Sequence, residues 1–412
     1  MLPINVLHFA DTHIGMRNYG YFHRESGLNS RVLDFLRCMS EVIDYALDND
    51  VDLCVFSGDA YKNQRPDPTI QREFSRRMKR LTTAGIPVIF LVGNHDMPSA
   101  DRAASSLDIY RTLDVPGAIV ADREEIYNLS CRRGQDVQVV TMPYPQRNRL
   151  LSRDEYKHLR QQSIEDLDNT IAEIMEADIE DLIKEAQQNP DVPTIFVGHF
   201  SVTGSVYGSE KSVMIGRDVV VSKGHLANPV WDYVALGHIH KHQELNNGAH
   251  PPIVYPGSLE RIDFGEEKES KGFVMAKVEK GKTEWEFITV KSRPFRTIRV
   301  DVRKSDDPMS KILDEIISHH VAGAIVRVII HATEEQDPLI EDYTIEKSLE
   351  EASYIAGIKH DIDRVFRKRL GETNIETLTP EKALGLYFQS KGMEPEHQEK
   401  LMKHAEIVIK GE

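Results

Sequence analysis

Aspartate, asparagine and histidine residues follow five apolar runs of this chain, either directly or after one glycine. The runs cover residues 6–10, 53–57, 88–92, 195–197 and 233–236. The polar residues that follow them are Asp11, His13, Asp59, Asn94, His95, Asp96, His199, His238 and His240. These residue types bind metal ions, and α/β folds place their chemistry at the carboxyl ends of strands. The pattern therefore predicts one metal site at the carboxyl end of a sheet.

Seven of these residues are candidate metal ligands: Asp11, His13, Asp59, Asn94, His199, His238 and His240. Asp11 and His13 lie two residues apart at a predicted strand end, so both side chains leave on the same side and can bind one ion. Asp59 has two oxygens and can bridge two ions. The set is too large for one ion with an open position, and it suits two. Two ions about 3.5–4 Å apart clamp the attacking and leaving oxygens of a phosphoryl displacement, and a hydroxide shared between them is the expected nucleophile.

His95 follows Asn94 directly, so it cannot easily point at the same ion. We assign it to protonating the leaving oxygen or to stabilising the pentacoordinate phosphorus, with Asp96 as its orienting partner. The mixture of carboxylates and imidazoles favours Mn²⁺, Fe²⁺ or Zn²⁺ over Mg²⁺, which prefers oxygen ligands alone. The absence of thiolates among the candidates argues against a closed structural zinc site.

Each motif is weak alone, because Gly-Asp and Gly-Asn are also turn signals. Their joint occurrence, each after a β run, is much more specific. Together they resemble the five signatures of the calcineurin-like metallophosphoesterases. The resemblance implies an α/β fold: a two-sheet β-sandwich flanked by helices, with a dinuclear centre. It also implies two ligand groups: Asp11, His13, Asp59 and His240 for one metal, and Asp59, Asn94, His199 and His238 for the other.

The sequence around the motifs is similar to the SbcD-type DNA repair exonucleases, strongly over residues 4–290. The similar segments are residues 8–15 with 19–20, 237–241, 255–261, 264–266 and 271–273. This resemblance implies a Mn²⁺-dependent homodimeric nuclease that processes double-strand DNA ends and hairpins, exo- and endonucleolytically, with an SMC-like ATPase (SbcC-type) in double-strand break repair. Many relatives carry a histidine three residues after the bridging aspartate, where this chain has Lys62. That departure leaves the balance of exonuclease and endonuclease activity open.

Candidate DNA-binding residues follow the first two motifs: Arg17, Asn18, Tyr19, Arg24, Lys62 and Arg65. Both segments leave predicted strand ends on the metal side. Positive, planar and aromatic groups beside a phosphate-cleaving centre suit a polyanionic substrate. The alternative is an ordinary polar loop, because loops are polar in any case.

The elements that must position these residues can be read from the hydrophobic periodicity. Residues 1–120 alternate strands with helices at 32–47 and 70–81, which predicts parallel strands with crossover helices. Residues 151–188 predict one long or broken helix, which Pro190 and Pro193 end. Two β runs between 272 and 290, separated by Gly281-Lys282, predict a hairpin that closes the second sheet.

Three domains are predicted: a nuclease domain at 1–292, a small α+β capping domain at 293–357 and a helical tail at 358–412. A β-α-β pattern over residues 297–330 resembles the DNA-engaging cap of SbcD-like nucleases. In that family the tail binds the ATPase, and a helix docking in a groove is a physical route to this. The alternatives are a plain accessory domain and a tail that packs on its own domain.

The resemblance also implies a dimer bundle formed by helices near residues 70–81 and 105–113. Phe74, Met78, Leu107 and Tyr110 are the candidate contacts, and all four could equally belong to the core.

Composition limits the remaining choices. The 412 residues have a formal charge of −15, which argues against a free-standing basic DNA-binding protein. The three cysteines lie far apart, which fits a reducing compartment. We see no signal peptide and no apolar run of membrane-spanning length, so we expect a cytoplasmic, nucleoid-associated protein.

Two rival functions are consistent with parts of this pattern. A small-substrate phosphodiesterase or phosphatase could use the same centre, but it leaves the cap and tail without a task. A non-enzymatic scaffold that recruits an ATPase would be expected to have lost some of the metal-binding residues, but all seven candidates are present. The leading interpretation is therefore a metal-dependent DNA nuclease.

Overall fold

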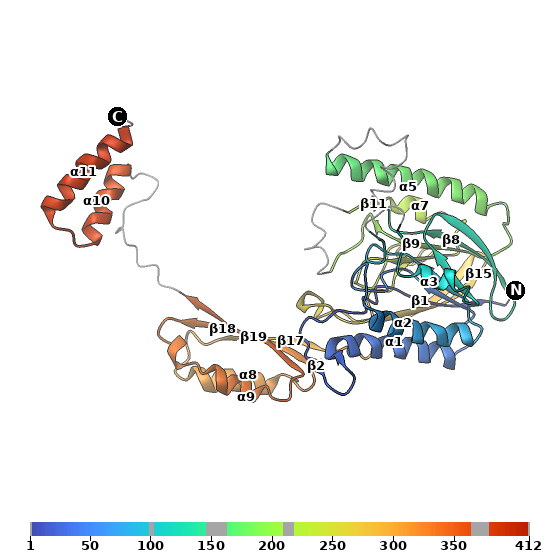
Figure 1. Ribbon diagram of the computed structural model, residues 1–412, viewed down its shortest axis with the longest axis horizontal. Coiled ribbons are helices and arrows are strands. Elements are labelled where there is room, and N and C mark those ends of the chain that lie inside the picture. Colours follow the sequence, from blue (N-terminus) through green and yellow to red (C-terminus); the bar gives the residue numbers. More distant parts are fainter. Residues whose placement is uncertain (1, 99–102, 146–162, 209–217, 364–378, 411–412) are drawn as a thin grey trace.

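Two six-stranded sheets stack face to face at the centre of the larger, N-terminal part of the chain (Figure 1). The computed structural model describes residues 2–98, 103–145, 163–208, 218–363 and 379–410. In spatial order the first sheet contains β16 (Lys282–Thr289), β15 (Gly272–Glu279), β1 (Ile4–Phe9), β4 (Leu53–Phe56), β5 (Val88–Leu91) and β6 (Ala118–Ala121). The second contains β13 (Gln243–Glu244), β14 (Ile253–Tyr255), β12 (Tyr233–Gly237), β9 (Thr194–His199), β8 (Asp136–Met142) and β7 (Glu125–Ser130).

Helices cover the outer face of each sheet, which confirms the predicted sandwich flanked by helices. The first sheet is covered by α1 (Ser30–Asp48), α2 (Pro68–Thr83) and α3 (Asp108–Thr112), and the second by α5 (Ile164–Ala186) and α7 (Lys223–Leu226). Central strands such as β4 and β5 are therefore buried on both faces. This explains why they are unbroken apolar runs rather than alternating ones.

Local sequence accounts for where the helices begin. Asn29 accepts a hydrogen bond from the Arg31 amide at the start of α1. Asp67 caps α2, and Pro68 occupies its first turn, where a missing N–H costs nothing. Ser163 caps α5, which is shorter than the predicted helix at 151–188; residues 151–162 of that prediction lie outside the described residues.

The five apolar runs lie in two sheets rather than one, which corrects the single-sheet expectation. β1, β4 and β5 are parallel neighbours in the first sheet, and β9 and β12 are parallel neighbours in the second. The β15–β16 hairpin also differs from expectation, because β15 pairs with β1 and so extends the first sheet, not the second. Alternation along a strand predicts a hairpin but does not say which sheet the hairpin joins.

A three-stranded parallel sheet with its helices follows the sandwich, and we call this unit, residues 295–363, the cap. Its strands are β17 (Phe295–Asp301), β18 (Ile325–Thr333) and β19 (Tyr354–Asp363), and α8 (Pro308–Ser318) and α9 (Asp342–Ser348) cover one face. β19 crosses the predicted boundary between residues 357 and 358, so the cap sheet extends to Asp363. The glycine and charged residues of β19 concealed it in the sequence.

Short elements complete the described chain. They are β2 (Phe22–His23), β3 (Leu28–Asn29), β10 (Ser201–Val202), β11 (Val220–Val221), the 3-10 helices η2 (Phe264–Glu266) and η3 (Asp337–Leu339), and α10 (Pro380–Ser390) and α11 (Pro395–Lys410). α10 and α11 pack against each other. Among the described residues, no helix is both long enough and apolar enough to cross a bilayer.

Candidate metal centre

The loops that follow β1, β4 and β12 bring ligand candidates together through an unusual backbone. Asp11, His13, Asp59 and His238 have positive φ angles of 50°, 40°, 59° and 95°. Such left-handed conformations cost about 1–3 kcal/mol each for residues other than glycine, and persist only where the surroundings enforce them. Here, backbone hydrogen bonds join the loops: the Asp11 amide donates to the Gly58 carbonyl, and the His13 amide to that of Asp59. The sandwich thus supports strain at the site.

Two motif glycines permit the close approach of neighbouring loops. A Cβ at Gly237 would lie 2.0 Å from the carbonyl oxygen of Ser57, which belongs to the other sheet. A Cβ at Gly93 would lie 2.2 Å from Oδ1 of Asp59. Gly237 is therefore needed where the two sheets meet, and Gly93 where the loops after β4 and β5 meet.

The first ligand group gathers around His13 and His240. Their Nε2 atoms lie 3.0 Å apart, and Nε2 of His13 is 3.7 Å from Oδ2 of Asp59. Ligand atoms of Asp11, His13 and His240 all lie within 4.8 Å of one another. These side chains are almost fully buried, so their donor atoms converge on a space shielded from water.

The second ligand group gathers around Asn94. Its Oδ1 atom lies 3.0 Å from Nε2 of His199 and 3.1 Å from Nδ1 of His238. Nε2 of His199 is also 3.4 Å from Oδ1 of Asp59. The two Asp59 oxygens thus face different histidines, one in each group, which is the geometry expected of a bridging carboxylate.

Each histidine of the second sheet has a partner on its other ring nitrogen. Nδ1 of His199 donates to the Ser57 carbonyl at 2.6 Å, which makes Nε2 the ring nitrogen that faces the other ligand candidates. Oδ2 of Asp218 lies 3.1 Å from Nε2 of His238, and Oε1 of Glu266 lies 3.0 Å from Nδ1 of His240. Such partners fix the orientation and tautomer of metal-binding imidazoles and increase their basicity.

Sequence reasoning missed both carboxylates. Glu266 belongs to the segment 264–266, which had served only to indicate the family resemblance. Asp218 follows no motif and has no signal in the linear sequence. A search for carboxylates near the ligands in sequence would also fail, because these residues lie 26 and 20 positions from their histidines.

Electrostatics prepares the ligands for a cation. Burial alone would raise the pKa of Asp59, but the surrounding imidazoles of His199, His95 and His13 hold it well below its usual range. Burial lowers the pKa of His13 well below its usual value, so this imidazole is neutral, as a ligand must be. Burial also lowers the pKa of His199, yet the Asp59 carboxylate outweighs it and raises the value to about 9. A cation at this position must compete with that proton.

His95 is oriented by a backbone carbonyl, not by Asp96. Its Nδ1 lies 2.7 Å from the carbonyl oxygen of Lys62, and its amide donates to Oδ1 of Asp59 at 2.9 Å. The Asp96 carboxylate instead accepts from the amides of Ala60 at 3.0 Å and Gly93 at 3.2 Å. The predicted orienting role of Asp96 is therefore wrong, because the turn points adjacent side chains in different directions. Asp96 fastens the loops after β4 and β5 together.

Five of the six DNA-binding candidates are exposed, namely Arg17, Asn18, Arg24, Lys62 and Arg65. Arg17 pairs with Asp67 at 3.3 Å across an open surface, where such a pair stabilises little. Tyr19 differs: its ring packs on Phe264 and Phe295, with centroids 5.3 and 5.7 Å away. Tyr19 therefore belongs to the apolar cluster that joins the sandwich to the cap. The prediction that Tyr19 contacts DNA is not supported.

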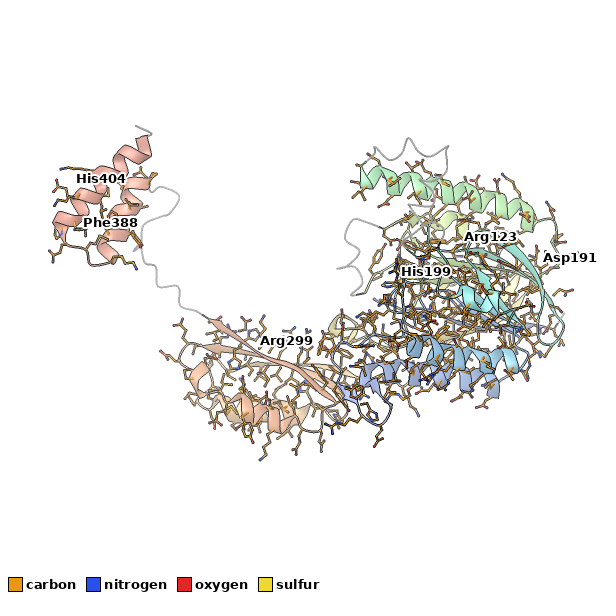
Figure 2. All side chains as sticks on the ribbon, in the orientation of Figure 1. Arg123, Asp191, His199, Arg299, Phe388 and His404 are labelled. Atoms are coloured by element: carbon orange, nitrogen blue, oxygen red, sulfur yellow. The ribbon has the colours of Figure 1, made fainter. Side chains whose placement is uncertain are left out.

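The donor set fits two divalent cations. Two carboxylates, four imidazoles and an amide converge with Asp59 between two groups, and Figure 2 shows the position of His199 within the sandwich. Bound cations of this kind polarise phosphoryl oxygens and activate water. The fold and the site thus define a metal-dependent phosphoesterase.

Comparison with known proteins identifies the family. The calcineurin-like phosphoesterase family model matches residues 4–242, and the chain belongs to this family. It is 26% identical over 349 residues to the DNA double-strand break repair protein Mre11 of Thermoplasma acidophilum, covering 82% of this chain and 79% of that protein. It is 25% identical over 303 residues to the SbcD component of the SbcCD nuclease of Bacillus subtilis, covering 70% of each chain. A shorter match, 33% identical over 135 residues, covers 33% of this chain and 25% of Mre11 of Haloferax volcanii.

Proposed function

We propose that this chain is the nuclease subunit of a DNA-repair complex that cleaves double-strand ends and hairpins by Mn²⁺-dependent phosphodiester hydrolysis. The observation that carries the proposal is the cluster of seven ligands with exposed basic residues on the loops beside it. The similarity to Mre11 and to the SbcD component of SbcCD over most of the chain supports DNA as the substrate.

The proposed roles of the site residues follow from their contacts. Asp11, His13, Asp59 and His240 hold one cation, and Asp59, Asn94, His199 and His238 hold the other. Because Nδ1 of His95 is committed to the Lys62 carbonyl, Nε2 is the nitrogen left for the phosphodiester. His95 would stabilise the phosphoryl group or protonate its leaving oxygen.

DNA would run along the exposed rim formed by Arg17, Asn18, Arg24, Lys62 and Arg65. The cap offers further cations on the face of its sheet opposite α8 and α9, where Arg299 lies in the same register row as Lys359 (Figure 2). Point charges such as these bind the phosphate backbone without reading the sequence.

A homodimer and an ATPase partner complete the proposal. Phe74, Met78, Leu107 and Tyr110 are buried in the first-sheet core, which favours the core alternative for these four residues. Ile109 and Leu113 on and beside α3 are 46% and 67% exposed, and we assign them as apolar contacts for a second copy. We assign the ATPase contact to α10 and α11, whose paired helices present the partly exposed Tyr387 and Leu401.

The first test is cleavage of a labelled hairpin-ended duplex by the purified chain with Mn²⁺, beside the His95→Ala variant and a simple aryl phosphodiester. DNA cleavage that disappears in the variant would support the nuclease. Turnover of the diester without DNA cleavage would favour the small-substrate phosphodiesterase.

Removal of residues 379–412 separates these two functions further. A small-substrate enzyme should keep full activity in this variant. A nuclease that works within a complex should still hydrolyse the simple diester but lose binding to its ATPase and extensive DNA degradation.

A further inference from the structure

One short segment lies between the metal centre and the cap and contacts both. It comprises residues 260–271, includes η2, and is called the connector here. It follows β14 in the sequence and precedes β15, so both of its ends are fixed by strands of the sandwich. None of the seven ligand candidates lies within it.

The connector holds His240 by both its side chain and its backbone. Glu266 is fully buried; its Oε1 faces Nδ1 of His240 at 3.0 Å, and its Oε2 accepts from the Ile262 amide at 3.1 Å. Nζ of the buried Lys271 lies 2.8 Å from Oε2 of Glu266 and donates to the His240 carbonyl at 3.1 Å. His240 is therefore clamped by an ion pair that lies wholly within the connector.

The next residue along the chain contacts the cap instead. Glu267 accepts hydrogen bonds from the amide and the hydroxyl of Thr297, on β17, at 2.9 and 2.6 Å. Phe264 packs against Phe295 of β17 with ring centroids 4.9 Å apart. The Arg327 guanidinium of β18 lies 4.2 Å from the centre of the Phe264 ring. Adjacent glutamates thus connect a metal ligand and a cap strand.

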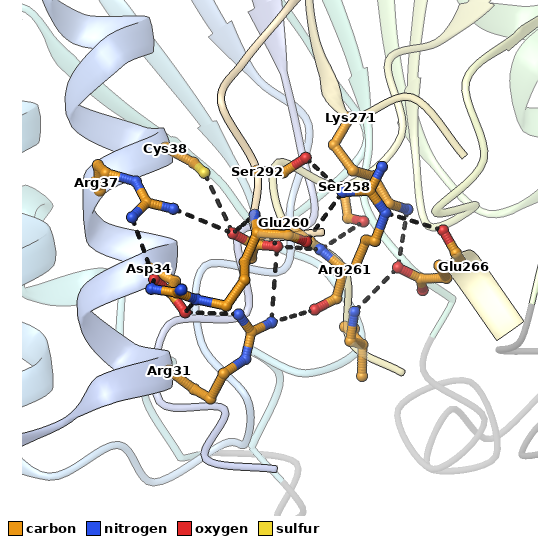
Figure 3. Close-up of polar contacts among 12 residues, drawn as sticks. Arg31, Asp34, Arg37, Cys38, Ser258, Glu260, Arg261, Glu266, Lys271 and Ser292 are labelled. Atoms are coloured by element: carbon orange, nitrogen blue, oxygen red, sulfur yellow. Dashed lines mark hydrogen bonds and ion pairs between the residues drawn. The ribbon is translucent and has the colours of Figure 1, made fainter. Parts of the chain in front are cut away.

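A network of hydrogen bonds holds the base of the connector (Figure 3). Arg261 donates to the carbonyls of Glu266 at 3.2 Å and Glu269 at 2.6 Å, and to the Ser292 hydroxyl at 2.7 Å. Glu260 is fully buried and accepts from the Arg293 amide at 2.9 Å, where the chain leaves the sandwich for the cap. Satisfied buried polar networks stiffen the structure around them and hold one arrangement. A shift of the cap would therefore reach Glu266 rather than be absorbed in a loose loop.

We propose that Glu267 and Thr297 are positioning residues for His240 and act through Glu266. The position of the cap against the connector then sets the affinity of the cation site to which His240 contributes. The inference rests on the proposed ligand role of His240. Its physical basis is that a metal ligand must be held within about 0.5 Å of its working position, and Glu266 can do this only while the connector is in place. Cap seating and cation binding then favour each other, because coupling between two sites is reciprocal.

The experiment is a Mn²⁺ titration of the metal-free full-length chain by calorimetry, with the number of bound ions counted by electron paramagnetic resonance. Glu266→Gln should weaken one of the two ions by about 10- to 100-fold, the range found for outer partners of ligands. Glu267→Ala and Thr297→Val should each weaken the same ion by about 2- to 30-fold, the range of long-range coupling. The Glu267→Ala/Thr297→Val double variant should lose no more Mn²⁺ affinity than the weaker-binding of these two single variants, because both residues act through one contact.

Two controls make the outcome decisive. Asp363→Ala removes a carboxylate of the cap that pairs with Arg303 and not with the connector residues Phe264 or Glu267. This variant should bind both Mn²⁺ ions with unchanged affinity. His240→Ala should abolish one ion. Thermal melts of the metal-free variants show whether each is folded, and Thr297→Val, which keeps the shape of the side chain, serves if Glu267→Ala does not fold.

The results distinguish the inference from its premise. Wild-type affinity in Glu267→Ala and Thr297→Val, together with loss in Glu266→Gln, would overturn the coupling and leave Glu266 as a local partner. Two ions bound with wild-type affinity by His240→Ala would instead refute the ligand role of His240.

Discussion

Four histidines of this metal centre are held in two different ways. His199 and His95 each face a backbone carbonyl, that of Ser57 and that of Lys62, and we call them backbone-held. His238 and His240 face the carboxylates of Asp218 and Glu266, and we call them carboxylate-held. Both kinds of partner orient the ring, but only the second adds a negative charge.

This difference separates a fixed side of the site from an adjustable one. The Ser57 carbonyl directly follows the end of β4, and the Lys62 carbonyl lies further along the same loop, where the Lys62 amide donates to the Ile14 carbonyl. The carboxylates come from segments between strands, and one of them is the connector that contacts the cap. Carboxylate-held ligands can therefore respond to mutation, to DNA or to the cap, whereas backbone-held ligands cannot do so easily. Substitutions of the ligands and of their partners distinguish the fixed side from the adjustable one.

Asp59→Ala should remove both cations, because Asp59 faces the backbone-held His199 with one oxygen and the His13–His240 group with the other. Metal analysis after dialysis against Mn²⁺ should find neither ion. Asp306→Ala, at an exposed position of the cap, is the control and should retain both. Retention of two ions by the Asp59 variant would contradict the bridging role.

His95→Ala should reduce DNA cleavage by about 10²- to 10⁴-fold, the usual contribution of general acid–base groups, while both cations stay bound. Steady-state kinetics and metal analysis of the same sample measure the two effects. Lys62→Ala is the matched control for a backbone-held ring. It keeps the carbonyl that orients His95, so it should change substrate affinity more than the maximal rate. Loss of metal in His95→Ala would refute this role.

Asp218→Asn should weaken one cation by about 10- to 100-fold, since outer carboxylates contribute this much to metal affinity. Ser57→Ala should leave both affinities unchanged, because His199 uses only the Ser57 carbonyl. Calorimetric titration with Mn²⁺ compares the two variants directly. Equal losses in both would remove the distinction between carboxylate-held and backbone-held ligands.

His8 provides a histidine of a third kind, buried between the sheets beside the Tyr233 hydroxyl at 2.9 Å. Burial lowers its pKa from 6.5 to about 3. Between these two pH values, His8 is protonated in the unfolded chain and neutral in the folded chain. Stability from this group is therefore present above pH 6.5 and is lost as the pH falls towards 3. Between pH 7.5 and pH 5 the loss should be about 2 kcal/mol, at 1.36 kcal/mol per pKa unit.

The measurement is denaturant unfolding of the metal-free protein at both pH values, with His8→Phe for comparison. The variant should lose about 2 kcal/mol less than the wild type over this range. The same pH dependence in both proteins would show that His8 titrates normally in the fold.

The sequence alone determined the chemistry of this protein. The strand ends, the seven ligand candidates and the separate position of His95 are local properties, because each candidate lies within four residues after an apolar run. Helices α1, α2 and α8 could also be predicted, since caps and 3.6-residue periodicity lie within one segment.

The partners of those ligand candidates depend on the tertiary packing. The five strand ends lie in two sheets, and Asp96 accepts from the amides of Ala60 and Gly93. Tyr19 packs at the junction with the cap. Asp218 and Glu266 lie beside ligand histidines that are distant in the sequence. The physical reason is the range of the interactions. A strand and its end are specified by neighbouring residues, whereas hydrogen-bond partners are chosen by the packing of segments that lie far apart in the sequence.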